Sequence, residues 1–325
     1  KLDSEPFHLT VLAKNYQGYL NLMKLTTTSH IEGYYYRPRV DKKLLKQFSE
    51  GLIALSGCPS GEFIRSLDHD DLKKAEEVIR SYQEIFGEGN FYLEIQKHPY
   101  NESAQAATDE IIRQDMLRMA NLQDQTWSAV KELSQKLGIP PVATNDFHYV
   151  EKEDAQVQDV LLCIQTGKFL SDTDRLRMID TPDYFVKSPQ DLSEDFSQMS
   201  EALSTTVKIA QEINLEIPLG KARFPIFTTP QNTTSKEFLS NLTKEQGEQK
   251  LKMTKEVKER LEYELGIIEQ KKYADYFLVV SDFVQWAHQK GIITNTRGSA
   301  AGSLVLYCLG VTNLNSGTSA SASTF

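Results

Sequence analysis

The sequence predicts an α/β protein in which a parallel sheet is followed by a second, mainly helical domain. Short β-rich runs alternate with longer amphipathic stretches over the first two-thirds of the 325 residues. Such a βα rhythm is typical of a parallel sheet, open or closed into a barrel, with its chemistry at the carboxyl ends of the strands. Prolines and a linker-like segment then separate this part from a charged helical region.

The predicted elements of the first part follow one another in chain order. Residues 71–86 (DLKKAEEVIRSYQEIF) carry apolar side chains at helical spacing. A second helical region is broken or bent somewhere between Ser103 and Leu137, before the turn Gly138-Ile139-Pro140-Pro141. The strand-like runs are residues 9–12, 52–56, 91–95 and 142–144.

Composition shifts predict where the domains divide. The stretch 220–234 (GKARFPIFTTPQNTT) reads as a linker, and the region beyond it begins with charged, helical residues 235–270. The last ten residues, SGTSASASTF, have no periodicity and almost nothing to bury. We therefore expect four parts: a first domain (1–215), a linker (216–234), a second domain (235–315) and a disordered tail (316–325).

Composition also restricts the class of protein. No apolar run approaches the roughly 20 residues that span a bilayer, and the first residues lack the layout of a signal peptide, which predicts a cytoplasmic protein that does not enter the membrane. Cys58, Cys163 and Cys308 are odd in number and far apart, which fits a reducing compartment better than a disulfide framework. The net charge of −9 argues against a protein coated in nucleic-acid phosphate, although an acidic chain can still bind DNA in one basic cleft.

Potential metal ligands lie next to the predicted strands. Cys58 follows the first buried strand, His98 follows the second, and Asp146 and His148 follow the third, while His8 flanks the strand-like run near the amino end. In a parallel sheet these side chains converge at one edge, and thiol, imidazole and carboxylate together suit zinc or a related transition metal. Each residue alone also fits a structural role in a turn, a loop or a strand end, so the prediction depends on their shared position.

Three segments resemble, in order and roughly in spacing, the PHP domain of bacterial DNA polymerase III alpha subunits, the family C replicative polymerases. They are residues 7–15 (FHLTVLAKN) followed by Gly18-Tyr19, residues 51–58 (GLIALSGC) and residues 142–150 (VATNDFHYV). The resemblance implies a PHP-type distorted (β/α)7 barrel, incomplete at its amino end, that holds a metal cluster with nine ligands. His8, Cys58, Asp146 and His148 fall on four of these ligand positions, and His98 lies close by with a weaker match. Zn²⁺ or Mn²⁺ is the metal expected there.

The second domain resembles the start of the same family's polymerase-beta-like palm. Residues 276–280 (YFLVV) and 283–286 (FVQW) precede 297–305 (RGSAAGSLV), as they do in that palm. The resemblance implies that a Gly-Ser pair meets the triphosphate of the incoming nucleotide, and it makes Arg297, Gly298, Ser299 and Ser303 candidate nucleotide-binding residues.

The residue types of the 297–305 segment suit nucleotide binding. Gly298 allows close backbone approach, Ser299 offers a hydroxyl, and a helix over residues 300–309 would present an amino end that favours phosphate. The alternative is that the small residues serve tight helix packing. The chain also departs from the family, with Thr294-Asn295-Thr296 where Gly-Pro-Gly is usual and a different pattern from Ser316 onward.

The resemblance also implies what lies outside this chain. In the family, a His-x-His motif and further metal ligands precede the equivalent of Lys1, and the catalytic aspartates follow the equivalent of Phe325. We therefore expect this fragment to hold metal weakly and to lack polymerase activity, because two-metal phosphoryl transfer needs those carboxylates to bind Mg²⁺.

The leading hypothesis is that the parent protein is a Mg²⁺-dependent, DNA-directed DNA polymerase acting in bacterial replication. Its partners would be primer-template DNA, dNTPs, the sliding clamp, a proofreading exonuclease and other replisome subunits. Two alternatives stay open: a PHP-type metal-dependent phosphoesterase or 3′–5′ exonuclease, and a PHP domain that is only a scaffold for the polymerase.

Overall fold

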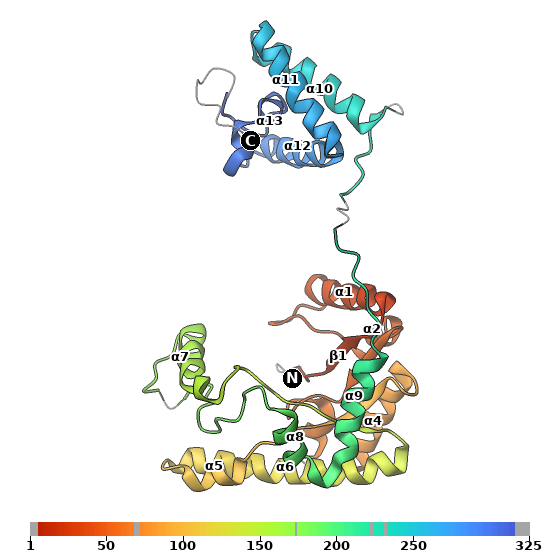
Figure 1. The fold of residues 1–325 in the computed structure, drawn as a ribbon, viewed down its shortest axis with the longest axis vertical. Helices are drawn as coiled ribbons and strands as arrows, with labels where there is room; N and C mark the ends of the chain where they lie inside the picture. Colours follow the sequence, from red (N-terminus) through yellow and green to blue (C-terminus); the bar gives the residue numbers. More distant parts are fainter. Residues whose placement is uncertain (1–5, 68–71, 173, 221–223, 231–232, 316–325) are drawn as a thin grey trace. The chain divides into compact units, whose positions relative to one another are not determined.

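The computed structural model describes residues 6–67, 72–172, 174–220, 224–230 and 233–315. The chain forms two compact units, unit 1 (Lys1–Ile217) and unit 2 (Pro218–Phe325) (Figure 1). The tail that the sequence predicts to be disordered, 316–325, lies outside the described residues, as do 221–223 and 231–232 of the predicted linker.

Unit 1 combines a sheet with helices, so its described part is a helix-rich α/β fold. The strands are β1 (Thr10–Ala13), β2 (Leu52–Leu55), β3 (Phe91–Ile95) and β4 (Pro141–Ala143). The helices are α1 (Tyr16–Ile31), α2 (Lys42–Gln47), α3 (Glu62–Leu67), α4 (Leu72–Phe86), α5 (Tyr100–Ala106), α6 (Glu110–Leu137), α7 (Ala155–Thr166), α8 (Pro189–Asp195) and α9 (Ser200–Glu212), with 3-10 turns η1 (Lys152–Asp154) and η2 (Ser197–Met199). The helical break expected between Ser103 and Leu137 is confirmed by the gap between α5 and α6.

The four strands form one sheet in the order β1-β2-β3-β4. β2, β3 and β4 are parallel, as predicted, but β1 is antiparallel to β2, with Thr10 opposite Leu55. The prediction of a fully parallel set is therefore wrong for β1. The apolar pattern of residues 9–12 marks a strand, but it is the same in either chain direction, so it carries no information about polarity.

The described residues do not close this sheet into a ring. β1 and β4 are its two edges among the strands that the structure describes. The seven-stranded barrel implied by the resemblance is thus not confirmed, whereas the mixed α/β class is.

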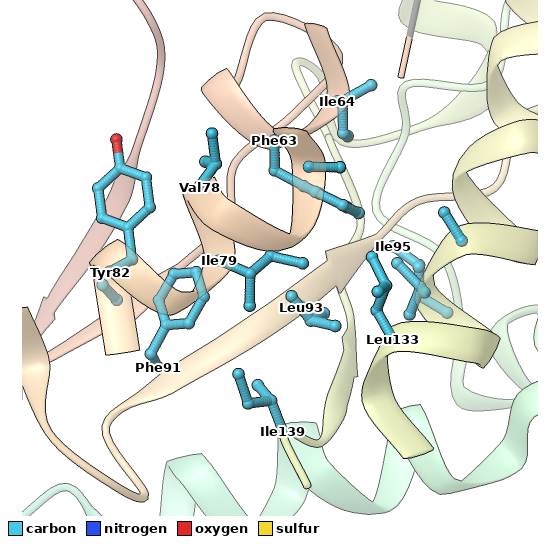
Figure 2. Close-up of a cluster of buried hydrophobic side chains, with 14 of the residues drawn as sticks. Phe63, Ile64, Val78, Ile79, Tyr82, Phe91, Leu93, Ile95, Leu133 and Ile139 are labelled. Atoms are coloured by element: carbon cyan, nitrogen blue, oxygen red, sulfur yellow. The ribbon is translucent and has the colours of Figure 1, made fainter. Parts of the chain in front are cut away.

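Both faces of the sheet are covered by helices. Figure 2 shows Leu93 and Ile95 of β3 packed with Phe63 of α3, Ile79 of α4 and Leu133 of α6. The alternate strand residues pack on the opposite face against α9, in a cluster that contains Ile53, Leu55, Tyr92, Val142 and Ile209. Strands buried on both faces read as continuous apolar runs, which is why β2 and β3 were recognisable in the sequence.

Unit 2 is helical in the part that the structure describes. Its elements are α10 (Ser235–Lys250), α11 (Lys255–Gln270), α12 (Ala274–Gln289), the 3-10 turn η4 (Gly298–Gly302) and α13 (Leu304–Cys308). Thr254 divides the predicted helical stretch in two, because its side chain accepts a hydrogen bond from the Val257 amide and starts α11. Leu304 and Val305 of α13 are completely buried.

The helix expected from residue 300 begins later in the structure. Residues Gly298–Gly302 form the 3-10 turn, and α13 starts only at Leu304. The physical reason is Ser303, which has an extended backbone (φ −80°, ψ 124°) and accepts a hydrogen bond from the Leu306 amide through its hydroxyl. A residue in that state is an N-cap and cannot lie inside a helix.

Two expectations from composition can be compared with the structure. Cys58, Cys163 and Cys308 are all free thiols, as predicted. A search of the described helices finds none that is both long and apolar enough to cross a bilayer.

Candidate metal and nucleotide sites

A cavity of about 1130 Å³ opens at the edge of the sheet where β2, β3 and β4 end. Three of the five predicted metal ligands, His8, Cys58 and Asp146, lie along its wall. Lys42 and Glu94 line it as well. The structure therefore places a thiol, an imidazole and carboxylates around one space, although His148 is not part of its lining.

His8 and Cys58 form one pair in this cavity, with 3.3 Å between His8 Nδ1 and Cys58 Sγ. The antiparallel direction of β1 makes the contact possible, because it places the start of β1 beside the end of β2. The backbone amide of His8 also donates to the Ser60 carbonyl at 3.0 Å. Burial raises the pKa of the Cys58 thiol, and the nearby negative charges of Asp146 and Glu94 raise it further.

Asp146 and His148 form a second pair, with 3.3 Å between Asp146 Oδ1 and His148 Nε2. Both side chains are more than one-third exposed. The loop that carries them is tied to a later segment, because the His148 amide donates to the Tyr184 carbonyl at 2.7 Å and Asn145 Nδ2 donates to the Phe185 carbonyl at 2.9 Å.

His98 lies apart from these pairs. It is buried, and its Nδ1 is 3.1 Å from Oδ2 of Asp183, which also contacts Lys187 Nζ at 2.7 Å. Burial alone would raise the pKa of Asp183, but the hydrogen bonds from His98 and Lys187 lower it below its usual value. The His98 ring is thus held in an internal ion network and does not line the large cavity.

The donor types suit a metal, but their arrangement is only partial. Thiolate, imidazole and carboxylate are the ligands of zinc, and imidazole and carboxylate also suit manganese. In the described part of the chain, however, no three His, Cys, Asp or Glu side chains are grouped closely enough to hold an ion. The residues form two neighbouring pairs, which do not make a complete coordination shell by themselves.

Glu94 of β3 is a site residue that the sequence reasoning missed. It is only 4% exposed, and its carboxylate accepts hydrogen bonds from the Gly57 amide at 3.1 Å and the Thr144 hydroxyl at 2.6 Å. Burial raises the pKa of Glu94 despite these hydrogen bonds. The available signal was a single acidic residue within an otherwise apolar strand, FYLEI.

In unit 2 the predicted nucleotide loop is exposed at its start. Arg297, Gly298 and Ser299 are exposed, and Gly298 has a positive φ of 69°. A Cβ on Gly298 would meet no atom within 4 Å. The backbone conformation therefore explains this glycine, and crowding does not. Upstream, the Thr296 hydroxyl ties the loop to the Val311 carbonyl at 2.6 Å.

Beneath this loop lies Glu264 of α11, a second residue that the sequence reasoning missed. Its carboxylate accepts hydrogen bonds from the Ser303 hydroxyl at 2.8 Å and from the amides of Leu304 and Val305 at 3.2 and 3.1 Å. Arg260 Nε donates to it at 2.6 Å. The hydroxyl of Ser303 is therefore engaged inside the fold, where it supports the loop and caps α13.

Comparisons with known proteins match both units. A family model described as "PHP domain" matches residues 1–98, and one described as "Bacterial DNA polymerase III alpha NTPase domain" matches residues 236–320. These matches cover the segments that carry the cavity's amino-terminal wall and the Arg297 loop.

Curated relatives match almost the whole chain. It is 38% identical over 312 residues to a protein named DNA polymerase III subunit alpha from Treponema pallidum, and 37% identical over 313 residues to one of the same name from Borreliella burgdorferi. Each alignment covers 95% of this chain and 25% of the relative. A Campylobacter jejuni protein of that name is 37% identical over 97% of this chain and 27% of its own length. The chain spans about a quarter of the length of these relatives, and it belongs to the family of bacterial DNA polymerase III alpha subunits.

Proposed function

We propose that this chain is part of a DNA-directed DNA polymerase that adds dNTPs to a primer 3′-end on a template strand. The observation that carries the proposal is the 38% identity over 95% of the chain to a protein named DNA polymerase III subunit alpha. In this proposal residues 1–215 are a PHP domain whose sheet belongs to a distorted (β/α)7 barrel, 216–234 are a linker, and 235–315 begin a polymerase-beta-like palm.

The proposed working context follows from that assignment. The polymerase would act in the cytoplasm with Mg²⁺, primer-template DNA and dNTPs, alongside the sliding clamp, a proofreading exonuclease and other replisome subunits. A chain of this size supplies only some of the contacts that such an assembly requires.

Within this polymerase the Arg297 loop would hold the triphosphate of the incoming nucleotide. Arg297 would add positive charge, Gly298 and Ser299 would present backbone and hydroxyl donors, and Ser303 would hold the loop from below through Glu264. The role of the loop is positioning and electrostatic stabilisation rather than bond making. The exposure of residues 297–299 supports this proposal, because a phosphate group can reach them.

Primer extension by the complete polymerase that carries this chain tests the proposal. Ser299→Phe fills the loop with a bulky ring, so KM for dNTP should rise about tenfold or more while primer-template affinity stays within about twofold. Ser204→Phe, at an exposed position on α9, is the matched control and should change neither quantity. Unchanged dNTP use by Ser299→Phe would remove the nucleotide role, and absence of templated extension by the unmodified protein would remove the polymerase assignment.

A second candidate activity is supported by the cavity of unit 1. His8, Cys58 and Asp146 line it together with the cationic Lys42, which suits a metal-dependent phosphoesterase or 3′–5′ exonuclease. We propose that His8, Cys58, Asp146 and His148 contribute metal ligands, with His98 as the less favoured fifth because Asp183 holds it. A bound Zn²⁺ or Mn²⁺ would supply an activated water for hydrolysis.

Cobalt titration tests the ligand set without relying on activity. Thiolate coordination by Co²⁺ gives a sulfur-to-metal absorption band, so the unmodified chain should show that band at saturating Co²⁺ and Cys58→Ser should lack it. Cys163→Ser is the matched control, because Cys163 lies on α7 outside the cavity lining. If the band is absent, or if it survives in Cys58→Ser, the ligand assignment fails. Metal binding without hydrolysis of 3′-labelled DNA would favour the scaffold role.

A further inference from the structure

The loop between α1 and α2 carries an unusual concentration of exposed aromatic side chains. Tyr34, Tyr35 and Tyr36 are 62%, 46% and 75% exposed. Arg37 follows them and is also exposed. Figure 1 shows α1 and α2, which the loop joins in unit 1. We call residues 34–39 (YYYRPR) the aromatic loop. Exposing three neighbouring tyrosine rings to water leaves apolar surface unburied, and an apolar surface patch of this kind is typical of an interaction site.

The loop is held in a defined shape. Its two ends meet closely, because a Cβ on Gly33 would lie 2.2 Å from the Arg39 carbonyl oxygen. Inside it, the Tyr35 amide donates to the Arg37 carbonyl at 3.1 Å. Tyr36 has a φ of +58°, a left-handed conformation that favours glycine. A bulky aromatic residue at a position that glycine would occupy more easily is a local source of backbone strain, which is typical of functional sites.

The three tyrosine rings of the aromatic loop differ in how much of each is covered by neighbouring side chains. The Arg39 guanidinium lies 5.1 Å from the centre of the Tyr35 ring, and the Tyr35 and Tyr36 rings meet edge to face at 4.7 Å. Tyr35 is therefore partly covered by its neighbours, whereas Tyr34 and Tyr36 are the more exposed rings of the loop. Flat rings interleaved with guanidinium groups are the elements with which proteins stack unpaired bases and attract phosphates.

The aromatic loop is continuous with the wall of the large cavity. Pro38 and Arg39, at the end of the loop, line that cavity, as does Lys42 at the start of α2. His8 and Asp146 line the same space. A strand whose bases stack on the tyrosines would thus have its backbone next to cationic side chains and its end next to the candidate metal ligands.

We propose that the aromatic loop binds the unpaired bases of single-stranded nucleic acid and presents the end of the strand to the cavity. Tyr34 and Tyr36 each stack on a base, and Arg37 contacts phosphate. The proposal rests on the proposed phosphoesterase role only for the position of the strand's end. Stacking itself needs neither metal nor hydrolysis, so binding and catalysis can fail separately.

Fluorescence anisotropy with a labelled oligothymidylate of about 12 nucleotides tests the proposal on the complete chain without added metal. Tyr34→Ala and Tyr36→Ala should each weaken binding about tenfold, since one stacked base is lost in each. Tyr36→Phe keeps the ring and should bind within about twofold of the unmodified chain. Tyr263→Ala, at a 60% exposed position on α11, is the matched control and should bind normally.

Tyr36→Gly separates a binding role from a structural one. Glycine adopts the positive φ without strain, so this variant should melt at the same temperature as the unmodified chain or higher, yet bind as weakly as Tyr36→Ala. Parallel titrations with oligouridylate and with a DNA duplex show whether the ligand is DNA or RNA, and the duplex should bind weakly and be insensitive to the tyrosine changes. The proposal is overturned if the unmodified chain does not bind single strands, or if Tyr34→Ala and Tyr36→Ala bind like Tyr263→Ala. In that case the loop would contact protein.

Discussion

Glu94 in unit 1 and Glu264 in unit 2 are buried glutamates that organise loops in two unrelated settings. Glu94 tethers the turn at Gly57, and Glu264 tethers the segment that begins at Ser303. Glu94 receives its hydrogen bonds mainly from a backbone amide and hydroxyls, whereas Glu264 receives two backbone amides, a hydroxyl and the guanidinium of Arg260. The same side chain is therefore stabilised by neutral donors in one unit and with the help of a positive charge in the other.

The kind of donor around each carboxylate decides whether Glu94 or Glu264 can be replaced by a neutral side chain. A hydroxyl can reverse its role and accept a hydrogen bond, but a backbone amide and a guanidinium can only donate. Glu264 should therefore need both of its carboxylate oxygens as acceptors, while the neutral form of Glu94 should be tolerated. Changing each residue in turn tests that contrast.

The largest effect is expected from Glu264→Ala. The change leaves the buried Leu304 and Val305 amides and the half-buried Arg260 side chain without their acceptor, which should lower the free energy of unfolding of unit 2 by about 3 kcal/mol. Urea unfolding followed by far-UV circular dichroism measures the loss. A Trp286→Phe background leaves Trp127 as the remaining tryptophan, so its fluorescence follows the unfolding of unit 1 separately. Glu262→Ala, at an exposed position on the same helix, should cost less than about 0.5 kcal/mol. Equal costs for the two variants would show that Glu264 does not organise the loop.

A smaller effect separates the two glutamates through the isosteric change to glutamine. Glu264→Gln should cost about 2 kcal/mol, because one carbonyl oxygen cannot serve two amides and a guanidinium. Glu94→Gln should cost less than about 1 kcal/mol, because the Thr144 hydroxyl can reorient toward the new amide. The same unfolding measurement compares them, and a larger loss for Glu94→Gln would reverse the contrast drawn here.

The smallest expected effect is a pH dependence confined to unit 1. The pKa of Glu94 is raised in the folded state by burial, so the folded protein holds this proton more tightly than the unfolded chain does. Its contribution is fully present below the unfolded pKa of about 4.3 and is lost as pH rises through the folded pKa. Trp127-monitored unfolding from about pH 4 to pH 7.5 should therefore show the unmodified chain losing stability relative to Glu94→Gln. A gain over that range would mean that charged Glu94 is the favoured form.

Much of this fold could be predicted from local sequence, and each feature that was not predicted has an identifiable physical cause. β2, β3 and α4 were recognisable because burial on one or both faces leaves a periodic record in the chain. The late start of α13 follows from the local Ser303 N-cap, a signal that was present in the sequence but was not used. The direction of β1 was not predictable, because strand pairing depends on a partner distant in sequence. The same limit applies to the sites. Cys58 and Asp146 could be predicted to lie at the same edge of the sheet, whereas the pairing of His98 with Asp183 needed the fold.

The antiparallel direction of β1 also decides where labels can be attached. Because β1 runs against β2, the residues that precede it arrive at the cavity, and Pro6 and Phe7 form part of its lining. A fluorophore coupled to a cysteine introduced at Phe7 would therefore report on occupancy of that space.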